Sequence, residues 1–192
     1  MATGTHSPAR KAQENGRHIV VEKAFPAPSH LATPTDLKPQ EVQAITEALN
    51  PLVADLFALY VKTKNFHWHL SGPHFRDYHL LFDEQADQIF DGTDLLAERV
   101  RRVGGTTIRS IGHISQLQTL ADDNDTFVSP REMVRHLMDD NSTLARTMRA
   151  AHGVCERSRD YATTSILETL MDEAERRTWF LFEVAQGSDK TS

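Results

Sequence analysis

The chain has 192 residues, of which 39% are hydrophobic and 25% are charged. This composition is enough for one folded domain of about 150 residues with a tail, and it excludes a wholly disordered chain. The net charge of −6 argues against a uniformly basic protein that coats nucleic acid. The single cysteine, Cys155, excludes a disulfide framework and a cysteine-rich zinc site. With only short apolar runs and no secretory signal pattern, the sequence predicts a cytoplasmic protein with no membrane association.

Residues 1–38 are rich in Pro, Ala, Ser, Thr and His and show no sustained period, which predicts a flexible N-terminal arm. The arm has five basic and three acidic residues, a net charge of +2, so the rest of the chain carries −8. Its charged residues are Arg10, Lys11, Arg17, Lys23 and Lys38 against Glu14, Glu22 and Asp36. The arm is either a plain disordered terminus or a DNA-binding element, and the sequence leaves both interpretations open.

Two helical patterns fill the first half of the body. The first begins near Pro39 and ends at the loop Ser71-Gly72-Pro73. The second runs from about Phe75 to Val103 and is expected to stop at Gly104-Gly105. The apolar stripe of the first helix comprises Ile45, Leu49, Leu52, Leu56, Leu59, Thr63 and Phe66.

Two further helices follow after a connection of about 25 residues, which holds a possible short helix between Ile108 and Leu117. Ser129 as N-cap, Pro130 at the first helical position and Glu132 in a capping box open the third helix. The fourth runs from about Tyr161 to Ala185. Two hairpins joined by one long crossover predict an all-α, ferritin-like four-helix bundle over residues 39–186, with residues 187–192 as a short tail.

A group of potential metal ligands lies on the second helix. At 100° per residue, His79, Asp83, Asp94 and Glu98 fall within about 100° of one another on one face. With His67 just before the turn, they form a set of imidazoles and carboxylates that suits iron, manganese or zinc, and the carboxylates favour iron. The core stripe of this helix lies on another face and comprises Tyr78, Leu81, Gln85, Ile89, Leu96, Val100 and Val103.

The spacing of these ligands predicts a site shared by two chains. Asp83 and Asp94 are about 16 Å apart along a helix, too far to reach one metal ion. Both this pair and the pair of His79 with Glu98 have their midpoint between residues 88 and 89, so a second copy packed antiparallel across a twofold axis would join the two halves. The apolar residues expected to pack at that axis are Phe90, Ala97 and Ala86.

Two observations bear on the alternatives to this metal site. Asp87 and Asp91 extend the ligand face, so it is equally describable as a solvated acidic stripe with no bound ion. No Glu-x-x-His pattern occurs in the chain, so the usual di-iron site inside a ferritin-like bundle has no ligands.

The ligand region resembles that of the Dps family, the DNA-binding proteins from starved cells, also called miniferritins. The resemblance rests on Lys64-Asn65-Phe66-His67-Trp68, Gly72-Pro73-His74-Phe75, His79-x-x-x-Asp83-Glu84 and Asp94-x-x-x-Glu98-Arg99. It extends from about residue 37 to residue 185 and implies a hollow dodecamer that binds Fe²⁺, oxidises it preferably with hydrogen peroxide and stores ferric mineral. By the same resemblance, His67, His79 and Asp83 of one chain and Asp94 and Glu98 of the partner subunit form a ferroxidase site.

Other residues are interpreted through the same resemblance. Trp68 matches a tryptophan near the iron that acts in the family as an electron relay or radical quencher. The alternative for Trp68 is ordinary packing at the interface, and Trp179 is expected in the core. At the position where family members commonly carry a pore-lining Asp, this chain has Ser165, with Asp160 and Glu168 as the nearest substitutes. Two functions are therefore carried forward: an iron-storing ferroxidase, and a structural, nucleoid-associated DNA-compacting protein whose metal site is vestigial.

Overall fold

A computed structural model of the chain describes residues 28–186, in which the regular elements are helices and no strand occurs. Most of the predicted arm and all of the predicted tail lie outside the described residues. The elements in chain order are η1 (Ser29–Leu31), α1 (Pro39–His69), α2 (Phe75–Arg102), α3 (Ile111–Leu117), α4 (Pro130–Arg157) and α5 (Tyr161–Gln186).

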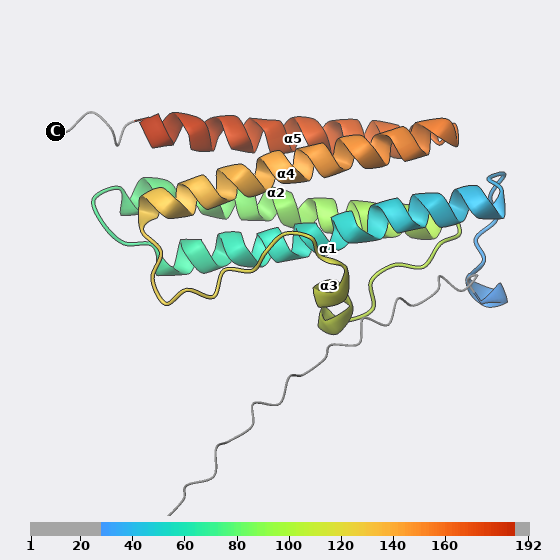
Figure 1. Ribbon diagram of the computed structural model, residues 1–192, viewed down its shortest axis with the longest axis horizontal. Helices are drawn as coiled ribbons and strands as arrows, with labels where there is room; N and C mark the ends of the chain where they lie inside the picture. The colour runs from blue at the N-terminus through green and yellow to red at the C-terminus, as the bar shows by residue number, and fades with distance from the viewer. Residues whose placement is uncertain (1–27, 187–192) are drawn as a thin grey trace, which may run out of the picture.

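The four long helices form an antiparallel bundle made of two hairpins (Figure 1). Helix α1 packs along α2, and α4 packs along α5, while α1 also contacts α4 and α2 contacts α5. The crossover from α2 to α4 passes along the outside of α1, and its short helix α3 packs against that helix. The predicted all-α, ferritin-like bundle with a helix in its crossover is confirmed.

Local sequence signals set the helix boundaries. Ser129 accepts a hydrogen bond from the backbone N–H of Glu132, whose carboxylate accepts one from the backbone N–H of Ser129, so the predicted capping box starts α4. Helix α2 ends where expected because Gly104 has φ of +93°, a left-handed conformation that glycine adopts without strain. The next residue, Gly105, lies so close to α1 that an added Cβ would be 2.1 Å from the Thr46 hydroxyl oxygen.

The apolar stripes predicted for the helices form the bundle core. The α1 stripe is buried, and so are the apolar side chains on the inner face of α4, Met133, Leu137, Leu144, Met148 and Ala151. Cys155 is fully buried in the same core, where desolvation raises the pKa of its thiol to about 11. The prediction for Trp179 was wrong: its side chain is 58% exposed, and its indole N–H donates to the Glu183 carboxylate at 3.0 Å. Helical spacing places this tryptophan on the outer face of α5, opposite Ala174 and Leu181, which are buried.

Helix α1 differs in one respect from the sequence expectation about membranes. By length and composition it is apolar enough to cross a membrane, although the individual apolar runs are short. Many of its apolar side chains belong to the bundle core, where α2 and α4 pack against them, while others, such as Val61, are exposed. A central helix of a helical bundle meets the same two criteria because it contacts other helices on several sides.

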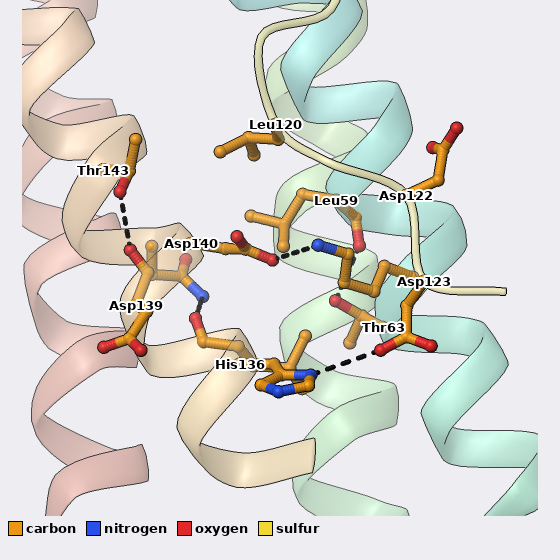
Figure 2. Close-up of polar contacts among 12 residues, drawn as sticks. Leu59, Thr63, Leu120, Asp122, Asp123, His136, Asp139, Asp140 and Thr143 are labelled. Carbon is orange, nitrogen blue, oxygen red and sulfur yellow. Dashed lines mark hydrogen bonds and ion pairs between the residues drawn. The ribbon is translucent and has the colours of Figure 1, made fainter. Parts of the chain in front are cut away.

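Polar contacts attach the crossover to the bundle. The buried Asp55 carboxylate on α1 accepts hydrogen bonds from the Thr119 N–H at 2.5 Å, the Thr119 hydroxyl at 2.7 Å and the Leu120 N–H at 2.9 Å. Further along, a His136 ring nitrogen on α4 lies 3.2 Å from the Asp123 carboxylate, as Figure 2 shows. The crossover is therefore fixed to both α1 and α4.

Replacing Asp55 by alanine should lower the free energy of unfolding by about 3 kcal/mol or more, because buried donors left without an acceptor cost about 1–3 kcal/mol each. Urea unfolding followed by circular dichroism measures this loss. Asp87→Ala, which removes an exposed carboxylate from α2, is the control and should change stability by no more than about 0.5 kcal/mol. Equal stability of the two variants would show that Asp55 does not hold the crossover.

Candidate metal centre

The tight turn between α1 and α2 brings two predicted ligands into contact. His67 lies near the end of α1 and His79 in the second turn of α2, and their rings stack with centroids 3.7 Å apart and an interplanar angle of 20°. His67 Nδ1 lies 2.9 Å from the backbone carbonyl oxygen of His79, and His79 Nδ1 lies 3.1 Å from that of His67. The two histidines thus hold each other in a reciprocal arrangement.

These hydrogen bonds fix the tautomer of both rings. A carbonyl oxygen can only accept, so each Nδ1 must carry the proton and donate it. Each neutral ring then presents the lone pair of its Nε2 atom, which is the form of imidazole that binds metal ions. In metal sites the ligating histidine commonly donates its other ring N–H to a carbonyl or carboxylate in this way.

Asp83 joins the two histidines one turn further along α2. One of its carboxylate oxygens lies 3.7 Å from His67 Nε2, and the same oxygen lies 2.5 Å from the Lys64 ammonium nitrogen. The hydrogen bond from Lys64 holds the pKa of Asp83 below its usual range, so the carboxylate stays ionised. Lys64 is part of the motif behind the family resemblance, but its contact with the site was not predicted; its spacing of three residues from His67 on α1 was the available signal.

Aromatic side chains surround this group of ligands. The Phe75 ring stacks on His79 with centroids 4.9 Å apart, so three rings lie in series and limit the rotation of both histidines. Trp68, the residue after His67, leaves 64% of its side chain exposed in a single chain. His67 itself is only 8% exposed, which places the metal-binding end of the group at the boundary between the bundle and its surface.

The other two predicted ligands lie elsewhere. Asp94 and Glu98 are exposed on the second half of α2, and the Glu98 carboxylate forms an ion pair with Arg102. In the described part of the chain, no three His, Cys, Asp or Glu side chains are grouped closely enough to hold a metal ion. The structure therefore brings His67, His79 and Asp83 together and leaves Asp94 and Glu98 apart from them; the shared site stays a prediction.

Only some of the apolar residues of α2 that lie between the two halves of the predicted metal site are exposed for contact with a second chain. Phe90 is 47% exposed, and one side of its ring packs on Tyr60 and Phe57 of α1. Ala97 is partly buried, whereas Ala86 is fully buried in the core. The expectation that Ala86 supplies interface packing was wrong, because the burial boundary of α2 lies closer to the ligand face than the helical angles indicated.

Two further predictions concern acidic residues around α5. Asp160 is buried, pairs with Arg99 and accepts a hydrogen bond from the Thr163 hydroxyl, and Glu168 lies 2.9 Å from a His152 ring nitrogen. Asp160 therefore caps α5 and is not free to line a pore in place of Ser165. The buried polar side chains of the described residues include Gln85, Asn141 and Arg177, and the two buried carboxylates, Asp55 and Asp160, bind the crossover and Arg99 respectively.

The arrangement matches known proteins. The family model of the ferritin-like domain matches residues 46–187. An uncharacterized low temperature-induced protein of a Nostoc species is 34% identical over 152 residues, covering 79% of this chain and 85% of that protein. The DNA protection during starvation protein of Brevibacillus brevis is 31% identical, and the match covers 72% of this chain and 93% of that protein. The crystal structure of a Dps protein from Bacillus brevis has a TM-score of 0.74 at 30% identity, and the match covers 77% of this chain and 99% of that one. With its bundle, its crossover helix and its paired histidines, the chain belongs to the Dps family of ferritin-like proteins.

Proposed function

We propose that this protein is a ferroxidase and iron store that assembles from twofold dimers into a dodecameric cage. The observation that carries the proposal is the pair of Nδ1-bonded histidines beside an ionised Asp83, a half-site that presents ligand atoms outward from one chain. Iron is the substrate, and the oxidant we favour is hydrogen peroxide. The cytoplasm, close to DNA, is the expected location.

The ligand types account for the chemistry. One Fe²⁺ would be bound by His67 of one chain and by Asp94 and Glu98 of the second copy. His79 and Asp83 would bind a second Fe²⁺ or a water molecule beside it. Imidazole nitrogens and carboxylate oxygens suit Fe²⁺, and anionic carboxylates attract Fe³⁺ more strongly because its charge is larger. Coordination by the two carboxylates of Asp94 and Glu98, with that of Asp83 nearby, therefore favours loss of an electron from the bound ion.

The redox reaction balances with peroxide as the acceptor. Each of two Fe²⁺ ions gives up one electron, and the peroxide O–O bond breaks as the molecule takes up both electrons and two protons to leave as water. Oxidation in an enclosed site keeps the reaction away from nucleic acid. This accounts for a protective role of the kind that the name of the Brevibacillus relative describes.

The double variant His79→Ala with Asp83→Ala tests this function. Fast oxidation of Fe²⁺ by peroxide, measured by stopped-flow absorbance of the ferric product, should fall to the rate without protein, because an imidazole and a carboxylate are lost from every site. The circular dichroism spectrum should stay that of a helical bundle, because neither side chain is part of the core. Oxidation at an undiminished rate by this folded variant would contradict the proposal.

A second candidate function is DNA binding and compaction, favoured by the arm with its net charge of +2. Repeated around a symmetric assembly, such arms would bind phosphates through many weak contacts. In this candidate the metal half-site is vestigial. Iron loading measured together with particle mass separates the two, since hundreds of ferric ions per particle are expected only for a store.

A further inference from the structure

A basic cleft of about 840 Å³ lies at the end of the bundle opposite to the paired histidines. It is bounded by the segment that leads into α1, the last turns of α2 and the turn between α4 and α5. Five basic side chains line it, namely Lys38, Arg99, Arg102, Arg157 and Arg159, against the three acidic side chains Asp36, Glu41 and Asp160. The cleft is therefore positive on a folded body whose overall charge is negative.

Most of these charges are already paired. The Lys38 ammonium lies 3.6 Å from the Glu41 carboxylate, and Arg99 pairs with the buried Asp160. Arg102 pairs with Glu98, which lies outside the cleft. Two of the three carboxylates that line the cleft, Glu41 and Asp160, are therefore balanced by a cation beside them, and among the described residues no ion pair balances the third, Asp36.

Two guanidinium groups remain available. Arg157, in the last turn of α4, and Arg159, in the following turn, are exposed, and within residues 28–186 neither guanidinium has a hydrogen-bond or ion-pair partner. Both line the cleft at the start of α5, where N–H groups of the first turn are already bonded, one of them to the Asp160 carboxylate. The positive charge that the cleft offers a ligand therefore comes from two unpaired guanidinium groups.

Arg159 occupies a backbone position that does not favour arginine. Its φ is +56°, and it is the one non-glycine residue in the described range with a left-handed backbone. Glycine or asparagine is the usual residue where a helix ends in this conformation. A strained arginine whose exposed side chain has no partner does not stabilise the fold through that side chain, which points to a role in binding another molecule.

We propose that this cleft is where the folded body contacts the phosphodiester backbone of DNA, an inference that rests on the DNA-binding candidate function. Exposed guanidinium groups with no buried donor beside them do not enclose a single phosphate ion. They suit a polyanion, which binds by releasing counterions and gains from repeated contacts. Residues 34–38 line the cleft, so the arm starts beside it and the two can follow the same duplex.

The full-length double variant Arg157→Gln with Arg159→Gln tests the inference. Fluorescence anisotropy with a labelled DNA duplex over a series of salt concentrations should show a several-fold weaker affinity. The slope of log K against log salt should become shallower by about 2 for each chain in contact with DNA. The control is Arg146→Gln with Arg149→Gln, which removes the same charge from exposed positions on α4 outside the cleft. An equal loss in both variants, or no loss in either, overturns the proposal.

Two more measurements distinguish a DNA-binding cleft from a structural role of Arg159 and from a phosphate-ion site. Arg159→Gly should raise the melting temperature, because it removes the left-handed strain, and at the same time weaken DNA binding; a purely structural Arg159 would not move the two in opposite directions. Inorganic phosphate should displace DNA no better than chloride at equal ionic strength, and stronger displacement would identify a phosphate-ion site instead. If the wild-type protein fails to bind DNA at low salt, the inference is wrong, while peroxide-dependent iron oxidation remains a separate test of the ferroxidase.

Discussion

Two variants of this protein that are each inactive should regain ferroxidase activity when they are refolded together. One variant carries His79→Ala with Asp83→Ala, and the other carries Asp94→Ala with Glu98→Ala. In a dimer that contains one chain of each kind, one of the two shared sites has all of its native ligands and the other has lost both halves. Random pairing should therefore restore about a quarter of the native sites. Stopped-flow oxidation of Fe²⁺ by peroxide measures the recovery.

The matched control mixes two variants with lesions in the same half-site, His79→Ala with Asp83→Ala on separate chains. Every site in that mixture lacks at least one ligand, so no comparable recovery is expected. Full recovery in the control would mean that a single ligand is dispensable. Absence of recovery in the first mixture, with co-assembly verified by mass spectrometry, would contradict a site shared between chains.

Replacing Phe90 by glutamate should produce smaller particles that bind iron only weakly. In the antiparallel dimer Phe90 lies next to the twofold axis, so the substitution places two carboxylates near one another and removes half-exposed apolar surface. Iron binding depends on dimerisation because each chain holds only one half of each site, and binding that requires one assembly state follows the population of that state. Light scattering and iron titration on the same samples measure both effects.

Phe90→Leu is the control for this prediction, since it keeps an apolar side chain at the axis. Particle size and iron affinity should stay close to those of the wild-type protein. A monomeric Phe90→Glu variant that binds iron tightly and stoichiometrically would show that the site is complete within one chain. The twofold arrangement inferred from the spacing of the ligands would then be wrong.

The candidate site was predictable only in part. Helical periodicity indicated that His79, Asp83, Asp94 and Glu98 share a face, because this depends only on residue spacing. It did not indicate on which half of the site His67 lies, and the close packing of α1 against α2 places it beside His79. The reciprocal Nδ1 hydrogen bonds and the Lys64–Asp83 contact also depend on the angle and distance between two helices, which spacing within one helix does not contain.

The helices, their limits and the architecture of the bundle follow from local patterns of residues. The capping box at Ser129 and the glycine at position 104 act through the backbone of neighbouring residues, so local composition is sufficient to predict them. Which side of each helix is covered depends instead on the packing of the whole bundle, in which Ala86 lies in the core and Trp179 lies outside it. Burial depends on how far each neighbouring helix extends around the circumference, and that distance is set by packing among side chains that are remote in the sequence.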